Sequence, residues 1–266
     1  MFIGKHEIAG MACIMGILNV TPDSFSDGGD FDTVEDALAQ VERMIAQGAA
    51  IIDVGGESTG PGAEFVTEEE EIARIVPVIQ AIKAKYDVLI SIDTYKTATA
   101  RAALEAGADI LNDVWAGLYD GQMLALAAEK NVPIILTHNQ KEEVYNDVTE
   151  DVCTFLSQRA QAALEAGVAK DNIWIDPGFG FAKNVQHNID LLKGLDKVVA
   201  LGYPVLFGIS RKRVVNYLLG GNTQAKDRDQ GTAALSGYAV SKGCQIVRVH
   251  NVDANRDIVK TISGIL

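Results

Sequence analysis

The chain has 266 residues, of which 48% are hydrophobic and 22% are charged, and its formal net charge is −13. This length and composition are typical of a folded globular protein and exclude a disordered or fibrous one. The acidic balance disfavours nucleic acids and anionic membranes as partners, because both are bound by basic surfaces.

Eight short apolar runs, rich in Ile and Val, alternate with longer segments of helical periodicity. The runs cover residues 13–18, 50–54, 88–92, 109–112, 133–136, 172–175, 204–209 and 245–249. Their nearly continuous apolar character is typical of parallel strands that are covered on both faces. Eight such units in a chain of about this length favour a single (β/α)8 barrel domain over residues 1–266, with a doubly wound sheet as the alternative.

The segments between the runs carry helix signals at their ends. The first helix is expected to begin at the N-cap Thr33 and to close at Gly48. The second is expected from Thr67, with acidic residues at its start and basic residues at its end, as the helix dipole prefers. Further helices are expected at 97–107 and 147–167 and after the last three strands.

Most of the runs end in polar residues, and in a (β/α)8 barrel these ends meet at one rim, where active sites are built. The polar residues at these ends are Asn19, Asp53, Glu57, Ser58, Asp93, Asn112, Asp113, His138, Asn139, Asp176, Ser210, Arg211, Lys212, Arg248 and His250. So many converging polar groups predict a functional mouth. Two long Gly/Pro-containing loops, 19–31 and 57–65, follow the first two strands and are interpreted as lids over it.

Positive charge is concentrated after the last two strands, although the chain as a whole is acidic. Arg211, Lys212 and Arg213 follow the seventh run, and Arg248 lies in the eighth. Many barrels bind phosphate in this region, so the sequence predicts a pyrophosphate site there. The alternative is a helix that simply begins with solvated charges.

Asp93, Asn112 and Asp176 supply carboxylate and amide groups at the same rim. A carboxylate accepts paired hydrogen bonds from two adjacent N–H donors, and an amide offers both a donor and an acceptor. The edge of a 2-aminopyrimidinone ring presents such a pattern. The set therefore indicates a pterin in preference to a sugar or a simple acid.

The cysteines and the chain ends indicate a compartment. Cys13, Cys153 and Cys244 are far apart and form no CxxC pair, so neither structural zinc nor a disulfide framework is expected. Free thiols fit a reducing compartment. The first residues lack the features of a signal peptide, and no stretch reaches the ~20 apolar residues of a membrane span, so a cytoplasmic protein is expected.

Seven segments together resemble the ordered motifs of the dihydropteroate synthase family, from about residue 13 to about residue 253. They are MGILNVTPDSFSDGG, IIDVGGEST, ISIDT, ILNDVW, IDPGFGFAK, GISRKR and VRVHNV. The resemblance implies a barrel enzyme of folate biosynthesis, the target of sulfonamides. It would condense 6-hydroxymethyl-7,8-dihydropterin pyrophosphate with p-aminobenzoate to give 7,8-dihydropteroate and pyrophosphate, with Mg2+ assisting. It also implies a homodimer formed through late helices.

The resemblance assigns roles to residues of the rim. The pterin would be held by Asp93, Asn112, Asp176, Phe181, Gly208 and Lys212. The pyrophosphate would be held by Asn19, Arg248 and His250, with Asn19 near the metal. The p-aminobenzoate would be surrounded by Ser58, Thr59, Pro61, Phe181 and Arg213. The catalytic residues would be Asp27, Asp93, Asp176 and Lys212, with Asp27 closing over the reacting centre from the first loop.

Other activities fit the sequence less well. A barrel that passes a methyl group from methyltetrahydrofolate to a corrinoid would share the Asp, Asn, Asp set, but would not need the long first loop or the SRKR run. A metal-dependent hydrolase needs clustered histidines, whereas His6, His138, His187 and His250 form no HxH pair. An aldolase using Lys212 as a Schiff base has similarly little support. A non-catalytic pterin-binding protein stays open, because Gly60 stands where many family members carry Arg.

Overall fold

The computed structural model describes residues 2–3, 6–7, 12–21, 30–57 and 65–266. The main sheet consists of β3 (Cys13–Asn19), β4 (Ile51–Gly55), β5 (Leu89–Asp93), β6 (Ile110–Asp113), β7 (Ile134–Thr137), β8 (Ile173–Asp176), β9 (Leu206–Phe207) and β10 (Ile246–Val249). These eight strands are hydrogen-bonded in the order β8-β7-β6-β5-β4-β3-β10-β9. All of their pairings are parallel.

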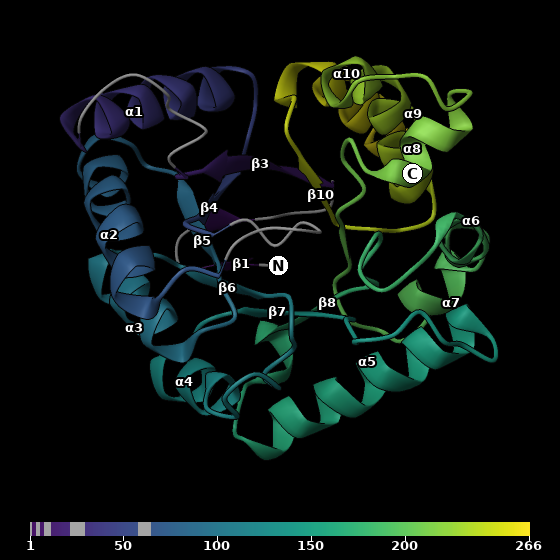
Figure 1. Ribbon diagram of the computed structural model, residues 1–266, viewed down its shortest axis with the longest axis horizontal. Coiled ribbons are helices and arrows are strands. Elements are labelled where there is room, and N and C mark those ends of the chain that lie inside the picture. The colour runs from purple at the N-terminus through teal and green to yellow at the C-terminus, as the bar shows by residue number, and fades with distance from the viewer. Residues whose placement is uncertain (1, 4–5, 8–11, 22–29, 58–64) are drawn as a thin grey trace.

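A bridge between Ile175 and Val205 joins β8 to the segment that enters β9, so the two edges of the sheet meet. The helices surround this ring of strands (Figure 1). They are α1 (Asp30–Ala46), α2 (Glu68–Lys85), α3 (Thr97–Ala106), α4 (Met123–Lys130), α5 (Val148–Glu165), α6 (Val185–Lys193), α7 (Leu195–Val199), α8 (Arg213–Leu218), α9 (Asp229–Ser241) and α10 (Val252–Ser263). The predicted (β/α)8 barrel is confirmed, and the doubly wound sheet is wrong.

Side chains at the helix ends explain where several helices begin. Thr67 caps α2 by accepting a hydrogen bond from the Glu70 N–H at 3.2 Å, as expected. Asp147 caps α5 in the same way. In contrast, α1 begins at Asp30, so Thr33 lies in its first turn and is not the cap. The helix therefore begins earlier than predicted.

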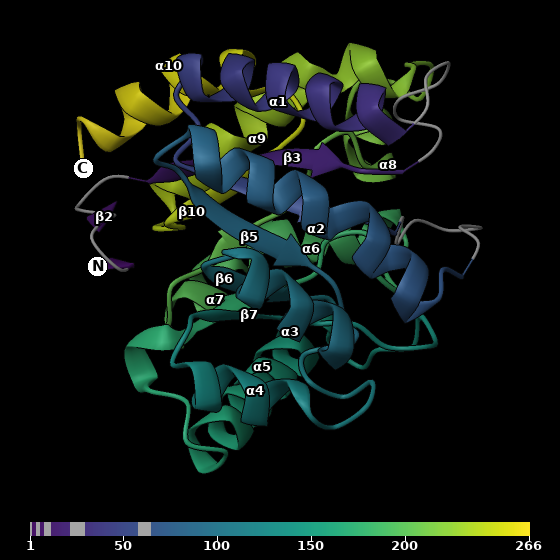
Figure 2. The same cartoon turned by 90° about the vertical axis from the view of Figure 1, so that its left-hand side faces the viewer.

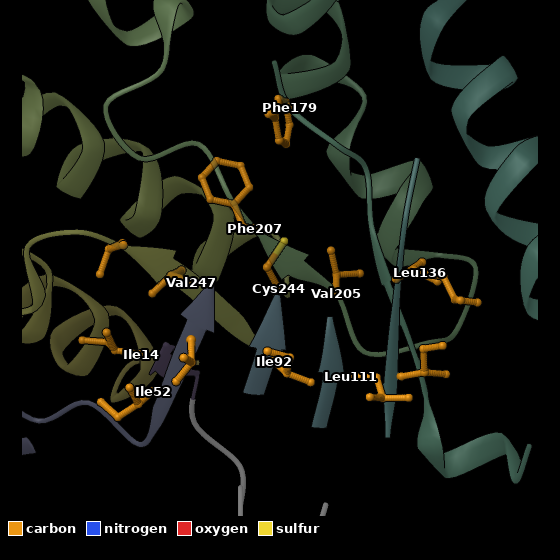
Figure 3. Packing of buried hydrophobic residues seen from close by; sticks show 14 of the residues in the cluster. Ile14, Ile52, Ile92, Leu111, Leu136, Phe179, Val205, Phe207, Cys244 and Val247 are labelled. Atoms are coloured by element: carbon orange, nitrogen blue, oxygen red, sulfur yellow. The ribbon is translucent and has the colours of Figure 1, made fainter. Parts of the chain in front are cut away.

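The apolar side chains form two separate layers. One layer fills the barrel interior with one side chain from each strand: Met15, Ile51, Leu89, Ile110, Ile135, Trp174, Leu206 and Ile246. The other lies between the strands and the surrounding helices and includes Ile14, Ile52, Ile92 and Val247 (Figure 3). Because side chains alternate along a strand, the residue two positions after each interior residue also faces inward.

This alternation brings polar residues into the upper part of the barrel. Five polar residues stand two positions after an inward-facing residue: Asp53 after Ile51, Asp93 after Ser91, Asn112 after Ile110, Asp176 after Trp174, and Arg248 after Ile246. The arrows of β3 and β5 point to the end where these residues lie (Figure 2). A short hairpin that the sequence did not predict, β1 (Phe2–Ile3) with β2 (His6–Glu7), lies at the opposite end.

All three cysteines are free, as expected, and Cys153 and Cys244 are buried. Within the described part of the chain, no helix is both long and apolar enough to cross a membrane.

Candidate active site

A cavity of about 530 Å³ opens at the carboxyl ends of the strands. Seven of the residues to which the sequence assigned a role line it: Asn19, Asp93, Phe181, Lys212, Arg213, Arg248 and His250. They come from β3, from β5 and β10, and from the loops after β8, β9 and β10, so distant parts of the sequence meet at one mouth.

Arg248 connects two carboxylates across the barrel interior. Its Nε donates a hydrogen bond to Asp53 Oδ2 at 2.5 Å, and its Nη2 donates to Asp93 Oδ2 at 2.5 Å. The amide of Asn112 donates to the same Asp53 oxygen at 3.1 Å. Asp53, Asp93 and Asn112 are all buried, and the network forms the floor of the site, with Asp93 and Arg248 at the cavity surface and Asp53 and Asn112 beneath it.

Several oxygen atoms of this floor lack a partner within the described part of the chain. They are Asp93 Oδ1, Asn112 Oδ1 and Asp53 Oδ1. A buried acceptor without a donor costs about 1–3 kcal/mol, so unpaired acceptors gathered in one place indicate a binding site for N–H donors. Burial raises the pKa of Asp93 to about 7, against the opposing effect of the Arg248 charge.

Asp176 lies on the other side of the site, next to Lys212. Its Oδ1 accepts a hydrogen bond from the Gly178 N–H at 2.7 Å, and burial raises the pKa of its carboxyl. Its Oδ2 would lie 3.4 Å from a Cβ atom at Gly208, so the glycine leaves this oxygen accessible. Burial lowers the pKa of Lys212 to about 8, against the attraction of Asp176.

The ammonium group of Lys212 is held by the loop after β8. It donates to the carbonyl oxygen of Phe179 and lies 4.5 Å from the centre of the Phe181 ring. Gly180 makes this approach possible, because its φ is +82° and a Cβ atom there would lie 2.9 Å from Lys212 Cδ. Phe181 and Lys212 therefore form one wall of the cavity together.

His250 and the Arg-rich loop that also carries Lys212 contribute further lining residues. His250 Nδ1 lies 2.9 Å from Ser210 Oγ, and burial lowers the pKa of this histidine to about 4, so its ring is neutral at neutral pH. Arg211 lines the cavity, but its guanidinium forms a bidentate ion pair with Asp229 at 2.6 and 2.8 Å. Arg213 lines the same cavity and is exposed, whereas Arg248 is held by Asp53 and Asp93.

Four of the assigned residues, Asp27, Ser58, Thr59 and Pro61, lie outside the described residues, as does Gly60. Among the described residues, Asn112, Asp176 and Gly208 lie beneath the cavity surface. Asn112 is connected to the site through its hydrogen bond to Asp53, and Gly208 lies against Asp176. The structure thus brings together every assigned residue that it describes.

Two further residues of the site, Asp53 and Lys183, were not expected to take a role in it. Lys183 is buried, and its Nζ lies 2.8 Å from His138 Nδ1 and donates to the carbonyl oxygens of Gly178 and Phe181. Burial lowers the pKa of Lys183 to about 7. The alternation of side chains in the strand IIDVG predicts that Asp53 faces the interior. Nothing in the sequence indicated the hydrogen-bonding groups around Lys183.

Comparisons with known proteins agree with this geometry. The family model described as pterin binding enzyme matches residues 15–250. A dihydropteroate synthase of Streptococcus pyogenes serotype M6 is 74% identical over 266 residues, which cover the whole of both chains.

Two solved structures extend the likeness to the fold. Xanthomonas albilineans dihydropteroate synthase with 4-aminobenzoic acid has a TM-score of 0.91 at 42% identity, covering 96% of this chain and 93% of that one. A complex of the Xanthomonas albilineans enzyme with 7,8-dihydropteroate has a TM-score of 0.89 at 39% identity, covering 98% and 95% of the two chains. These matches over nearly the entire length show that the chain belongs to the pterin-binding enzyme family, among its dihydropteroate synthases.

Proposed function

We propose that the cavity at the rim is where this chain carries out the dihydropteroate synthase reaction, and that its residues divide the two substrates between them. The reaction condenses 6-hydroxymethyl-7,8-dihydropterin pyrophosphate with p-aminobenzoate and releases pyrophosphate, as a step of folate biosynthesis. The observation that carries the residue roles is the group of acceptors on the floor without a partner among the described residues, together with the Lys212 ammonium group.

The pterin ring occupies the floor. Asp176 accepts from two adjacent N–H groups of the pyrimidinone edge, in the paired geometry that a carboxylate favours. Asn112 and Asp93 accept from the remaining ring donors through the oxygens that lack a partner in the described chain. Lys212 donates to the ring carbonyl, while Gly208 and Phe181 shape the space around the ring.

The pyrophosphate lies toward the last two strands, against Asn19, Arg248 and His250. Arg248 carries a full positive charge, because the neighbouring carboxylates raise its pKa further despite burial. His250 is neutral and can donate from a ring N–H to a phosphate oxygen. The local positive charge supports anion binding by an otherwise acidic chain.

Mg2+ fits as a metal that arrives with the pyrophosphate. No group of three or more His, Cys, Asp or Glu side chains that could hold a metal occurs in the described residues. Mg2+ is often bound by one or two protein oxygens together with phosphate oxygens and water. Asn19 offers an amide oxygen at the rim, 3.8 Å from where a Cβ atom on Gly55 would lie. We assign Asn19 as its ligand, and the bound ion would neutralise charge on the leaving group.

The p-aminobenzoate lies above the pterin, between Phe181 and Arg213. The Phe181 ring offers an apolar face, and Arg213 offers a charge for the carboxylate. The resemblance assigns Ser58, Thr59 and Pro61 to the same substrate and Asp27 to the reaction, and these four residues lie outside the described part of the chain.

The bond between the pterin methylene carbon and the pyrophosphate oxygen breaks before the new C–N bond is complete. The transition state is therefore cationic on the ring and anionic on the leaving oxygens. Asp93 and Asp176 stabilise the ring, and Arg248, His250 and Asn19 receive the negative charge. Charges aligned in advance of the reaction often make the largest catalytic contribution. The aromatic amine attacks in its neutral form, and the proton that its nitrogen loses as the C–N bond forms passes to water or to the released pyrophosphate, so the reaction needs no strong general base.

A homodimer and a cytoplasmic location complete the proposal. Apolar side chains of Tyr217, Leu218 and Leu219 on and after α8 are 58%, 50% and 45% exposed, which supports a contact between subunits through the late part of the chain. The free thiols support a reducing compartment.

Pyrophosphate release from the two substrates tests the proposal. Asp176→Asn should lower kcat/KM by about 100-fold or more, because it replaces one of the two carboxylate oxygens that accept hydrogen bonds from the ring. Asp113→Asn is the matched control, since this buried carboxylate accepts from the N–H groups of Trp115 and Gly117 and does not face the cavity. Unchanged turnover in Asp176→Asn would refute the role of Asp176. Pterin binding without any pyrophosphate release by the wild type would indicate a non-catalytic protein.

A further inference from the structure

We propose that Asp53 fixes the orientation of the Asn112 amide, and that this positioning residue thereby adds to the preference of the site for a ring with a 2-amino group. The inference rests on the proposed pterin site and goes beyond it, because Asp53 does not line the cavity. It acts through its neighbours and does not touch the substrate.

The position of Asp53 allows it to reach both sides of the barrel. In the sheet it pairs with Ile17 of β3 and Ser91 of β5. Its hydrogen-bond partners lie one strand further in each direction, with Arg248 on β10 and Asn112 on β6. Such contacts are possible only across the barrel interior, where the Asp53 side chain is fully buried.

A carboxylate can only accept hydrogen bonds, so Asn112 has to turn its NH2 group toward Asp53. The distance from Asn112 Nδ2 to Asp53 Oδ2 is 3.1 Å. The opposite orientation would place the amide oxygen against the carboxylate oxygen and bury the NH2 group elsewhere. In the observed orientation Asn112 Oδ1 is left without a partner among the described residues.

The free Asn112 oxygen lies in the same floor as the free Asp93 oxygen, since Asp93 and Asn112 are direct partners in the β5–β6 pairing. The groups that lack a partner here, among the described residues, are therefore acceptors. A ring that carries an amino group at this position satisfies them. A ring that carries a carbonyl at the same position would place one acceptor against another, which a site of buried polar groups rejects strongly.

The orientation of the Asn112 side chain depends on Asp53 more strongly than the position of Arg248 does. Arg248 has a second carboxylate partner, Asp93, at 2.5 Å. For the Asn112 NH2 group, Asp53 is the acceptor that the structure provides. Loss of the acceptor at position 53 should thus free the amide to rotate while Arg248 stays paired.

Two variants separate the acceptor from the charge. Asp53→Asn keeps an amide oxygen where Oδ2 lies and removes the charge, whereas Asp53→Leu is similar in size and removes the acceptor. The measurement is the dissociation constant of 6-hydroxymethylpterin and of 6-hydroxymethyllumazine, which carries oxygen in place of the 2-amino group. We expect the wild type and Asp53→Asn to prefer the pterin by at least about tenfold. In Asp53→Leu this ratio should fall by at least about threefold without disappearing, because Asp176 still accepts from the 2-amino group.

The outcomes are distinct. Failure of the wild type to bind 6-hydroxymethylpterin would overturn the proposed function itself. An unchanged ratio in Asp53→Leu, with weaker binding of both ligands, would show that Asp53 has only a structural role. An equal loss of preference in both variants would assign the effect to charge and overturn the inference.

A measurement on the wild type covers the case in which Asp53→Leu does not fold. The side-chain NH2 signals of Asn112 in a 15N-labelled sample can be assigned by their absence in Asn112→Ala. With the NH2 group bound to Asp53, these protons should exchange slowly with solvent before the ligand is added. Rapid exchange in the free protein that becomes slow only on addition of 6-hydroxymethylpterin would mean that the NH2 group faces the cavity, and would overturn the inference.

Discussion

Arg248 of β10 and Asp93 of β5 form an ion pair inside the barrel, with Nη2 and Oδ2 2.5 Å apart. The pair links the proposed pyrophosphate side of the cavity to the proposed pterin side. The arginine stabilises the ionised carboxylate, but burial is the larger effect and raises the pKa of Asp93 to about 7. The protonation of this floor therefore changes close to neutral pH.

Pterin affinity should follow that protonation. Above pH 7 Asp93 is ionised and accepts from the ring, and below pH 7 it takes up a proton in the free protein and loses this ability. The dissociation constant of 6-hydroxymethylpterin should rise by up to about tenfold from pH 8 to pH 6, and Asp93→Asn should remove this rise. Lys212, whose pKa is about 8, gains its proton over the same interval and acts in the opposite direction. Isothermal titration calorimetry at several pH values measures the dissociation constant.

Lys183 provides the control for the pH experiment, because its pKa is also about 7. Lys183→Met should retain the rise in the dissociation constant. A flat profile in that variant would assign the titration to Lys183 and not to Asp93. The nearby histidines do not change their protonation between pH 6 and pH 8, since burial lowers the pKa of His138 to about 3 and that of His250 to about 4.

The strands and the rim were predictable from the sequence because both depend on local pattern. Apolar runs predicted each strand of the barrel, and the polar residues after them predicted the members of the floor. The contacts of Asp53 could not be predicted, because they join β4 to β6 and β10 across the interior. The left-handed conformation of Arg211, with a φ of +60°, was also not predictable, since it depends on groups far along the chain.

Gly178 allows the loop after β8 to pass against β7. Its φ is +71°, and a Cβ atom there would lie 2.0 Å from the carbonyl oxygen of His138. Gly178→Ala should lower the free energy of unfolding by about 2–4 kcal/mol, because both backbone strain and a clash with the main chain oppose it.

Gly121→Ala is the matched control in the same denaturation experiment. Gly121 has a φ of +74°, but a Cβ atom there would meet nothing within 4 Å. Only the left-handed strain remains, which costs about 1–2 kcal/mol. Equal losses for the two variants would show that the contact with His138 does not restrict the loop.

Lys96 holds a buried cluster at the base of the second loop. Its Nζ lies 2.5 Å from Glu57 Oε2 and 2.8 Å from Glu71 Oε2, and the lysine is fully buried. Lys96→Met leaves two carboxylates without their cation, so the free energy of unfolding should fall by about 3–5 kcal/mol. Lys83→Met, which breaks the partly exposed pair with Asp109, should cost at most about 1 kcal/mol. Similar losses in urea denaturation would argue against the importance of burial.

Asp229 joins the two loops that carry the positive wall of the cavity. Its carboxylate binds the Arg211 guanidinium through both oxygens and accepts from Asn251 Nδ2 at 2.8 Å. Arg211 precedes Lys212, and Asn251 follows His250. Asp229 therefore holds Arg211 in its strained left-handed conformation and also fixes the loop that carries His250.

Asp229→Ala should release both loops and lower kcat/KM by about tenfold or more, because small displacements of aligned groups reduce the rate steeply. The double variant Arg211→Gly/Asp229→Ala should recover part of this loss, since glycine adopts a φ of +60° without strain. Steady-state kinetics of pyrophosphate release compares the three proteins. If the double variant is no better than Asp229→Ala, the backbone of residue 211 is not what Asp229 controls, and the clamp acts through the Asn251 contact alone.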